Sequence, residues 1–365
     1  MIIGIDASRA ALARRTGTET YAYQLIQALA DLTSAELRLR LYTPRPPAAE
    51  TWPSSPFVET RIIPFPRLWT HVRLAAEVAR RPPDVLFVPA HVLPWYCPAP
   101  AVVTVHDLGY LYHPEAHPFF QRRYLDWSTR RHARLARRLI ADSEATRADL
   151  IKHYQANPRL ISVVHLGYDP ALKPVSDSAS VKARYNIRGD YLLYIGTLQP
   201  RKNLLRLLEA FYRVGQSYPV SLVLAGGKGW LYETIFERVQ TLGLSERVIL
   251  PGFIAEEDKA ALISGALVYV YPSLYEGFGL PLLEAMACGA PILTSNVSSM
   301  PEIAGDAALL VDPYDVEAMA EALMRLLSDA GLRQTLIEKG FQRLPNFSWG
   351  KAAQQVLQIL IQSAS

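Results

Sequence analysis

Short apolar runs alternate with amphipathic stretches along the whole chain, and this alternation predicts its secondary structure. Runs rich in Leu, Val and Ile are typical of buried strands, whereas apolar residues spaced three and four apart are typical of helices that face a core. In the first half, strands are predicted at Ile2–Ile5, Leu37–Leu41, Val85–Val88, Ala101–Val105, Leu139–Ala141 and Ile161–Val164. In the second half, they are predicted at Leu192–Ile195, Ser221–Ala225, Val248–Leu250, Val268–Tyr271, Ile292–Ser295 and Ala308–Val311.

Helical patterns separate these predicted strands. Within the stretch Tyr21–Ala30, one face carries Tyr21, Leu25 and Leu29. After the first strand of the second half, a similar stripe is formed by Leu204, Leu207, Leu208 and Phe211. Strands that alternate with helices form parallel sheets covered on both faces, so we predict an α/β fold built from doubly wound, Rossmann-like domains.

The series of strands and helices starts again near residue 190, which predicts two domains. The stretch from Asp169 to Asp190 contains two prolines, a serine-rich tract and little periodicity, as expected of a linker. We therefore predict an N-terminal domain over residues 1–172, a linker over 173–190 and a C-terminal domain over 191–345. A last helix is predicted within residues 346–365 and can pack back on the N-terminal domain. Domains joined in this way would leave a cleft at the carboxyl ends of their strands, where such folds bind ligands.

Composition indicates a core-forming chain and excludes several classes of protein. Half of the residues are apolar and a fifth are charged, which excludes disorder. No uninterrupted apolar run reaches the roughly 18 residues that a membrane-spanning helix needs. The opening residues MIIGIDASRA predict a buried first strand rather than a signal peptide. With Cys97 and Cys288 as the only cysteines, no disulfide framework is expected, and we predict a cytoplasmic protein.

The charges are unevenly distributed. Residues 1–185 contain 24 Lys and Arg against 16 Asp and Glu, whereas residues 186–365 contain 14 against 18. A basic half beside an acidic half favours an anionic partner for the first half, such as a membrane surface or a phosphate-bearing acceptor. A chance distribution of solvated charges is the alternative.

The densest chemical signal is the segment Val268–Cys288, VYVYPSLYEGFGLPLLEAMAC. A strand runs into a loop and then into a helix, and Gly277 and Gly279 allow a sharp turn and close approach of a ligand to the backbone. The amides around Phe278–Leu280 would then face an anion at the positive end of the helix.

Two glutamates accompany this turn. Glu276 precedes it and Glu284 lies inside the helix, eight residues later. A carboxylate beside an anion-binding turn is unexpected unless it binds another group, and vicinal sugar hydroxyls are suitable donors. The alternative is an ordinary glycine-rich turn with a capping glutamate.

A second signal is the segment Ile195–Phe211, IGTLQPRKNLLRLLEAF, where a strand again leads into a helix. Arg201 and Lys202 stand at the helix N-terminus, although cations normally favour the C-terminal end. A diphosphate shared between these side chains and the amides would resolve the conflict. Alternatively, they are exposed basic residues of a surface loop.

Two weaker signals lie in the first half. Gly17, in the segment RRTGTETYAY, follows the first strand and could let a phosphate or sugar approach closely, or could belong to a plain loop with Thr18 or Thr20 as the helix cap. His106 follows the strand Ala101–Val105 and could donate to a sugar oxygen, or could be structural.

Several familiar motifs are absent from the sequence. No G-x-G-x-x-G follows the first strand and no G-x-x-x-x-G-K-[ST] occurs, which disfavours dinucleotide oxidoreductases and P-loop NTPases. No Asp-x-Asp occurs, so no carboxylate ligands for a metal-bound sugar nucleotide are evident. We therefore predict no metal and no cofactor. Nothing indicates nucleic-acid binding. Paired carboxylates would suit a glycosidase, but the basic pair favours a phosphate-bearing substrate.

Taken together, the motifs resemble the family-4 retaining glycosyltransferases of GT-B fold, and within them the bacterial mannosyltransferase-like branch. The resemblance spans nearly the whole chain and is carried by GTETYAYQLIQAL, TVHDLGYLYHPEAHP, ADSEATRADL, YIGTLQPRKNLLRLLEAF, GGKGWL, PGFI, PSLYEGFGLPLLEAMACGAPIL, MPEIAGDAALLVDP and FSW. It implies an N-terminal acceptor-binding domain, a C-terminal domain that binds a nucleotide-sugar donor, and a metal-independent reaction.

The resemblance also implies roles for single residues. Glu276 would hold hydroxyls of the donor sugar and Glu284 the ribose hydroxyls. Arg201 and Lys202 would bind the diphosphate and neutralise the leaving group, and His106 would lie near the reacting sugar.

Other residues would surround the donor. Gly277, Phe278, Gly279 and Leu280 would line the phosphate turn, with backbone amides from the last three, and Phe253 and Ile254 would lie beside the base. Gly17 matches a position near the donor phosphates. The family often has Gly-Gly or Gly-Ile-Gly there, whereas this chain has Thr-Gly-Thr, so the resemblance does not define the role of this loop.

Retaining transfer is expected by front-face attack of the acceptor hydroxyl. GDP-mannose is the first expectation for the donor, with UDP- and dTDP-sugars open, and a glycan or lipid-linked saccharide is expected as acceptor in surface polysaccharide, lipopolysaccharide or glycoconjugate biosynthesis. The alternatives are a sugar-nucleotide epimerase or phosphorylase of the same fold, and a non-catalytic sugar-nucleotide-binding protein.

A basic aromatic segment predicts peripheral contact with an anionic membrane at the inner face of the plasma membrane. It runs from His117 to Arg138 and contains Phe119, Phe120, Tyr124 and Trp127 among seven arginines. The alternative is a core-packed helix whose arginines are solvated.

Overall fold

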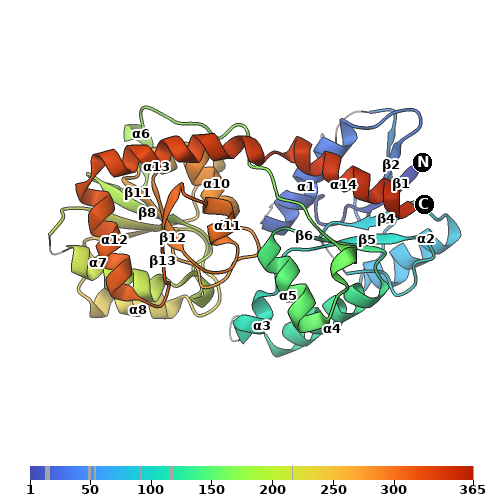
Figure 1. Ribbon diagram of the computed structural model, residues 1–365, viewed down its shortest axis with the longest axis horizontal. Coiled ribbons are helices and arrows are strands. Elements are labelled where there is room, and N and C mark those ends of the chain that lie inside the picture. The colour runs from blue at the N-terminus through green and yellow to red at the C-terminus, as the bar shows by residue number, and fades with distance from the viewer. Residues whose placement is uncertain are drawn as a thin grey trace. The chain divides into compact units, whose positions relative to one another are not determined.

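The computed structural model describes residues 1–12, 17–47, 51–52, 55–90, 92–114, 118–215 and 217–364. The chain forms two compact units (Figure 1). Unit 1 draws on Met1–Leu111, His117–Gly167 and Phe347–Ser365, and unit 2 draws on Tyr112–Ala116 and Tyr168–Asn346.

Unit 1 is built on a seven-stranded sheet in which all paired strands are parallel, in the order β3-β2-β1-β4-β5-β6-β7. Its strands are β1 (Ile2–Asp6), β2 (Arg38–Thr43), β3 (Val58–Ile62), β4 (Val85–Val88), β5 (Ala101–Val105), β6 (Arg138–Ala141) and β7 (Ile161–Val163). Its helices are α1 (Gly17–Ala30), α2 (Ala75–Arg80), α3 (Gly109–Tyr112), α4 (Phe119–Leu135), α5 (Glu144–Tyr154) and α14 (Trp349–Ala364), with a π-helical turn η1 (Thr70–Leu74) and a 3₁₀ turn η3 (Pro158–Leu160). Tyr112, the last residue of α3, already belongs to unit 2.

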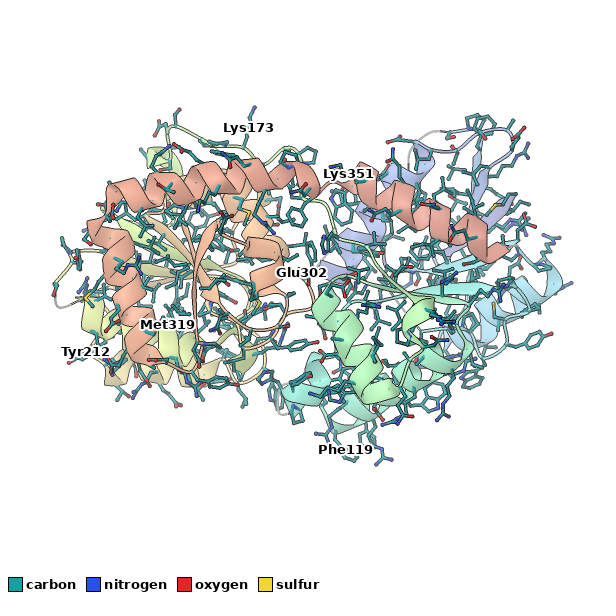
Figure 2. All side chains as sticks on the ribbon, in the orientation of Figure 1. Phe119, Lys173, Tyr212, Glu302, Met319 and Lys351 are labelled. Atoms are coloured by element: carbon teal, nitrogen blue, oxygen red, sulfur yellow. The ribbon has the colours of Figure 1, made fainter. Side chains whose placement is uncertain are left out.

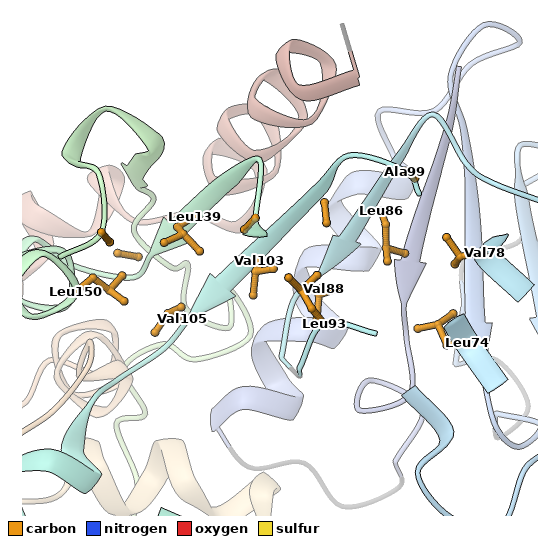
Figure 3. Close-up of a cluster of buried hydrophobic side chains, with 14 of the residues drawn as sticks. Leu74, Val78, Leu86, Val88, Leu93, Ala99, Val103, Val105, Leu139 and Leu150 are labelled. Carbon is orange, nitrogen blue, oxygen red and sulfur yellow. The ribbon is translucent and has the colours of Figure 1, made fainter. Parts of the chain in front are cut away.

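The core of unit 1 lies between this sheet and its helices (Figure 3). Leu86 and Val103 come from central strands, Val78 comes from α2 and Leu150 from α5, and all four are fully buried. On α1, the predicted stripe of Tyr21, Leu25 and Leu29 is also buried. The C-terminal helix α14 contacts α1, β4 and β5, so the last segment of the chain completes the first unit.

Unit 2 contains a six-stranded sheet, again parallel throughout, in the order β10-β9-β8-β11-β12-β13. Its strands are β8 (Tyr191–Ile195), β9 (Ser221–Ala225), β10 (Val248–Gly252), β11 (Val268–Tyr271), β12 (Ile292–Ser295) and β13 (Ala308–Val311). Its helices are α6 (Ala179–Arg184), α7 (Leu204–Gly215), α8 (Glu233–Thr241), α9 (Glu256–Ser264), α10 (Leu280–Ala287), α11 (Met300–Ala304), α12 (Val316–Ser328) and α13 (Ala330–Arg343), with 3₁₀ turns η4 (Pro200–Lys202) and η5 (Leu344–Asn346).

The predicted doubly wound fold is confirmed. All twelve strands expected from apolar runs are present, and their ends differ from the prediction by at most two residues. Strand β3 was not predicted. Its sequence VETRI is polar at the three central positions and lies at the edge of the sheet, where Arg40 of β2 pairs with Glu59 at 2.9 Å. Edge strands need no continuous apolar run, so the criterion used for buried strands missed it.

The predicted linker over residues 173–190 is part of unit 2 and contains a helix, α6. Arg184 donates to both carboxylate oxygens of Asp258 on α9, at 2.7 and 2.6 Å, and Tyr185 donates to the same carboxylate at 2.7 Å. The prolines, the serine-rich tract and the lack of periodicity predicted a linker, but these contacts attach the segment to helix α9 of unit 2. In the described part of the chain, no helix is both long and apolar enough to cross a membrane.

Candidate active site

The site in unit 2 is organised by the turn between β11 and α10. Gly279 has φ +106°, a left-handed conformation that favours glycine, and it immediately precedes the first residue of α10. Pro281 occupies the first turn of the helix, where its missing N–H costs nothing. Tyr275 and Phe278 are each 5% exposed and anchor the turn in the core. The turn therefore holds Glu276 close to the N-terminus of α10.

The basic pair converges on this turn. Arg201 Nη1 donates to Glu276 Oε2 at 3.0 Å and to the carbonyl of Tyr275 at 2.5 Å, and Lys202 Nζ donates to Glu276 Oε1 at 2.5 Å. The backbone N–H of Leu274 donates to the carbonyl of Arg201 at 2.9 Å. Two loops that are about 75 residues apart in sequence thus meet through backbone and side-chain bonds.

Asn203 explains why η4 stops where α7 begins. It has φ +60°, and its side-chain amide donates to the carbonyl of Pro313 at 2.6 Å. Asn tolerates the left-handed conformation better than most residues, so it can separate the two helical turns. The break leaves Arg201 and Lys202 on η4, next to Glu276.

The three charged side chains form a buried cluster. The side chains of Lys202 and Glu276 are each 9% exposed, and that of Arg201 is 15% exposed. Burial by itself would raise the pKa of Glu276, but the charges of Arg201 and Lys202 outweigh it and lower this pKa to about 2. Glu276 is therefore ionised at neutral pH, and the cluster carries one net positive charge beside the N-terminus of α10. Such an arrangement can bind an anion.

Tyr271 is a member of this cluster that sequence reasoning missed. Its hydroxyl accepts a hydrogen bond from Lys202 Nζ at 2.8 Å, and Lys202 Nζ lies 4.8 Å from the centre of its ring. Burial raises the pKa of Tyr271 well above its usual value, so it stays neutral. In the sequence, Tyr271 is one aromatic residue of the apolar run VYVY. Only its position at the carboxyl end of β11, where such folds bind ligands, could have suggested a polar role.

Glu284 occupies the second turn of α10 and pairs with a different cation. Lys259 Nζ on α9 lies 2.6 Å from Glu284 Oε1 and 3.4 Å from Glu256 Oε1. Burial alone would lower the pKa of Lys259, but the two carboxylates raise it. The Glu284 side chain is 18% exposed, so it can still meet a ligand. Lys259 was not predicted because it lies in the ordinary surface sequence EEDKA.

Phe253 and Ile254 differ in accessibility. Phe253 is 77% exposed, whereas Ile254 is 6% exposed and belongs to the core of the unit. A ligand could therefore contact the ring of Phe253, but the Ile254 side chain is packed against protein.

His106 and Gly17 belong to unit 1. His106 Nδ1 lies 2.7 Å from Asp142 Oδ2, and Nε2 lies 2.8 Å from the carbonyl oxygen of Pro89. Burial alone would lower the pKa of His106, but the Asp142 carboxylate outweighs it and raises this pKa. Both ring nitrogens thus have partners within the unit, and the ring also meets Tyr21 edge-on at 4.7 Å.

Gly17 is the first residue of α1, not part of the loop before it. It is exposed, and a Cβ added there would meet nothing within 4 Å. The preceding Arg14, Arg15 and Thr16 of the predicted phosphate loop lie outside the described residues.

Comparison with known proteins finds glycosyltransferases over both halves of the chain. Residues 179–343 match the family model for Glycosyl transferases group 1, and residues 15–172 match that for Glycosyltransferase Family 4. O-antigen chain mannosyltransferase B of Escherichia coli is 33% identical over 264 residues, which are 70% of this chain and 69% of that protein.

Two further proteins extend the comparison. The serotype-specific mannosyltransferase WbdA of Escherichia coli is 29% identical over 73% of this chain, which matches 33% of the length of WbdA. The solved structure of Alr3699/HepE from Anabaena in complex with UDP and glucose has a TM-score of 0.75 at 20% identity and covers 99% of both chains.

Two parallel, doubly wound sheets of seven and six strands, with a basic pair against a glycine turn in the second, define the GT-B class of glycosyltransferase fold. By both family models and by its likeness to mannosyltransferase B, the chain belongs to the group 1 and family 4 glycosyltransferases.

Proposed function

We propose that this glycosyltransferase transfers mannose from GDP-mannose to a glycan or lipid-linked acceptor in surface polysaccharide biosynthesis, with retention of configuration and without a metal. One observation carries the proposal of a nucleotide-sugar donor. Arg201 and Lys202 meet the turn at Glu276 inside unit 2, and together they provide two cations and a helix N-terminus for a diphosphate.

The proposed chemistry uses these groups as the glycosidic bond breaks. The bond between the anomeric carbon and the diphosphate oxygen is cleaved, and the acceptor oxygen bonds to the same face of that carbon. The proton of the acceptor hydroxyl goes to the departing phosphate oxygen. Arg201, Lys202 and the amides of the turn stabilise the negative charge that develops on the diphosphate. Glu276 would at the same time accept hydrogen bonds from sugar hydroxyls.

Mannose is favoured because both Escherichia coli relatives named above are mannosyltransferases. UDP- and dTDP-sugars are the other candidate donors, and the Anabaena protein of the same fold binds UDP. The choice of base and sugar would rest on groups around the turn. Of the two glutamates there, Glu276 would contact the donor sugar and Glu284 the ribose.

A donor panel tests the proposal. Purified protein is heated with GDP, UDP, dTDP and their sugars, because a ligand that binds the native state raises the melting temperature. Transfer from the best donor is then followed with mannan-type oligosaccharide and lipid-linked acceptors, and product anomeric configuration is read by NMR. We expect GDP and GDP-mannose to give the largest shifts, and an α-linked product from the α-linked donor.

Three other outcomes would replace the proposal. Conversion of the donor without an acceptor would indicate an epimerase, and dependence on orthophosphate would indicate a phosphorylase. Binding without transfer or hydrolysis of any donor would indicate a non-catalytic sugar-nucleotide-binding protein. A strict requirement for a divalent cation, abolished by EDTA, would contradict metal independence.

We also propose that helix α4 of unit 1 rests on anionic lipid headgroups. Phe119 and Phe120 at its start are 55% and 84% exposed, and Trp127 further along is 43% exposed. Figure 2 labels the Phe119 side chain at the surface of unit 1. The guanidinium carbons of Arg122 and Arg123 lie 5.7 and 5.6 Å from the centre of the Phe119 ring. Exposed aromatic rings flanked by arginines complement an anionic interface. His117, where the predicted segment begins, lies outside the described residues.

Liposome co-sedimentation tests this contact. We expect the protein to pellet with phosphatidylglycerol vesicles and not with phosphatidylcholine vesicles, and Phe120→Ala to reduce the bound fraction. Tyr212→Ala is the matched control, because Tyr212 is also an exposed aromatic residue of a helix, α7 in unit 2. Equal pelleting with both lipids, or an equal effect of the two substitutions, would contradict membrane contact by α4.

A further inference from the structure

Two serines after β12 are bonded to the turn that precedes α10. Ser298 Oγ donates to the carbonyl of Glu276 at 2.5 Å and accepts from the backbone N–H of the same residue at 3.3 Å. Ser299 Oγ lies 2.7 Å from the carbonyl oxygen of Phe278 and 3.0 Å from that of Glu276, so its single proton is shared between them. Ser299 is fully buried. We call these two residues the serine clasp.

The serine clasp determines which way two peptide planes face. A trans peptide is planar, and its carbonyl and its N–H point in opposite directions. When the serines hold the carbonyls of Glu276 and Phe278 on their side, the N–H groups of Gly277 and Gly279 must point to the other side. Gly277 and Gly279 lie where the chain turns into α10. Because glycine has no side chain, the orientation of each amide depends on the preceding carbonyl, which a serine holds.

The backbone at Ser298 supports a dedicated role for its hydroxyl. Ser298 has φ +55°, a conformation that glycine adopts without strain and that other residues disfavour. A glycine would suit the backbone better but would lose both bonds to Glu276. Ser298 thus keeps an unfavourable backbone conformation, and its hydroxyl is the group that bonds to the turn.

We propose that Ser298 and Ser299 are positioning residues, which act through the peptide planes of Glu276–Gly277 and Phe278–Gly279 to direct the Gly277 and Gly279 amides at the diphosphate of the donor. This inference rests on the proposed nucleotide-diphosphate-sugar donor. The serines do not touch the donor themselves. Their effect is strongest on the charged leaving group, because correctly oriented amides stabilise charge as it develops.

Ser298→Gly separates this role from a structural one. It relieves the left-handed backbone but removes the two hydrogen bonds of the hydroxyl, and these effects on stability oppose each other, so we expect a melting temperature close to that of the native protein together with a fall in kcat of about 10-fold. Ser299→Ala should lower kcat by about 10- to 100-fold with a smaller change in KM. A serine that only stabilised the fold would move the melting temperature and the activity in the same direction.

Ser295→Ala is the matched control. Ser295 is a buried serine three residues before the clasp, and its hydroxyl has no hydrogen-bond partner among the described residues. We expect its kcat, its KM and its affinity for GDP to match those of the native protein. The affinity for GDP, measured by calorimetry and compared with that for guanosine, should fall in Ser299→Ala, while the affinity for guanosine does not.

The outcomes separate the two proposals. If the native protein binds none of GDP, UDP and dTDP and transfers no sugar from their conjugates, the proposed function fails. If it binds and transfers, but Ser298→Gly and Ser299→Ala match Ser295→Ala in kcat and in GDP affinity, the serine clasp has no positioning role and the proposed function stands. A parallel loss of guanosine and GDP affinity in Ser299→Ala would also overturn the positioning role.

Discussion

Lys202 Nζ and Glu276 Oε1 lie 2.5 Å apart in the interior of unit 2, although 74 residues separate them in the sequence. Arg201 completes the arrangement on the second carboxylate oxygen. A buried carboxylate between two cations is stable only when each charge has partners, and a ligand that brings further negative charge can replace or supplement them.

Removal of either cation should impair transfer far more than folding. Arg201→Ala and Lys202→Ala each leave Glu276 with one cationic partner but remove a charge that stabilises the departing diphosphate, so we expect kcat to fall by roughly 10²–10³. Arg213→Ala on α7 is the control, because Arg213 is an exposed residue that pairs with the exposed Glu317. Near-native transfer by both site variants would argue against the proposed role of the pair. Steady-state kinetics with the best donor measures the effect.

Glu276 should make stability depend on pH in the acid range. Its pKa lies at about 2 in the folded chain and near the ordinary value of 4.5 in the unfolded chain. The carboxylate therefore contributes stability that is fully present above pH 4.5 and is lost as the pH falls toward 2. The free energy of unfolding of the native protein minus that of Glu276→Gln should be largest above pH 5, with an upper limit of roughly 3 kcal/mol, and should shrink between pH 5 and pH 3. Urea unfolding at a series of pH values checks this, and a difference that grows on acidification would contradict it.

Glu284 and Glu256 provide a matched pair of substitutions. Both carboxylates contact Lys259, but Glu284 lies on the site helix α10, whereas Glu256 is largely exposed on α9. If Glu284 binds the ribose hydroxyls, Glu284→Gln should weaken the binding of GDP by about 10-fold, and Glu256→Gln should leave it within a factor of two. 2′,3′-dideoxy-GDP lacks the ribose hydroxyls. If Glu284→Gln weakened the binding of this nucleotide as strongly as that of GDP, the effect would come from the lost contact with Lys259 and not from the ribose. Calorimetry measures the affinity of the native protein and of Glu284→Gln for both nucleotides, and that of Glu256→Gln for GDP.

His106 should stabilise unit 1 in a manner that weakens at high pH. The Asp142 carboxylate raises its pKa above the ordinary value of 6.5, so its contribution is fully present below that value and is lost as the pH rises through the higher pKa of the folded chain. We expect His106→Gln to destabilise the protein by roughly 3 kcal/mol near pH 6, since Asp142 loses its cationic partner, and by less at pH 9. Chemical unfolding of both proteins at these pH values is the measurement. A cost that increases toward pH 9 would exclude an imidazolium at this position.

Much of the fold could be predicted from the sequence because strands buried on both faces are continuous apolar runs. The helix stripes on α1 and α7 were equally visible, since a core-facing helix repeats its apolar residues with the helical period. Strand β3 and helix α6 were not visible in this way. Both are stabilised by tertiary ion pairs, such as Arg40–Glu59 and Arg184–Asp258, whose partners are distant in sequence.

The sequence by itself determined the local chemistry of the site: a glycine turn at the start of a helix, a basic pair before another helix, and glutamates eight residues apart. Local residue types suffice for this, because turns and helix ends depend on near neighbours. Only the tertiary structure decided that Lys202 meets Glu276 and Tyr271, that Lys259 pairs with Glu284, and that Ser298 and Ser299 hold the turn. Such pairings depend on which strand ends the sheet brings together, and the order of parallel strands is set by packing of the whole unit rather than by any single segment.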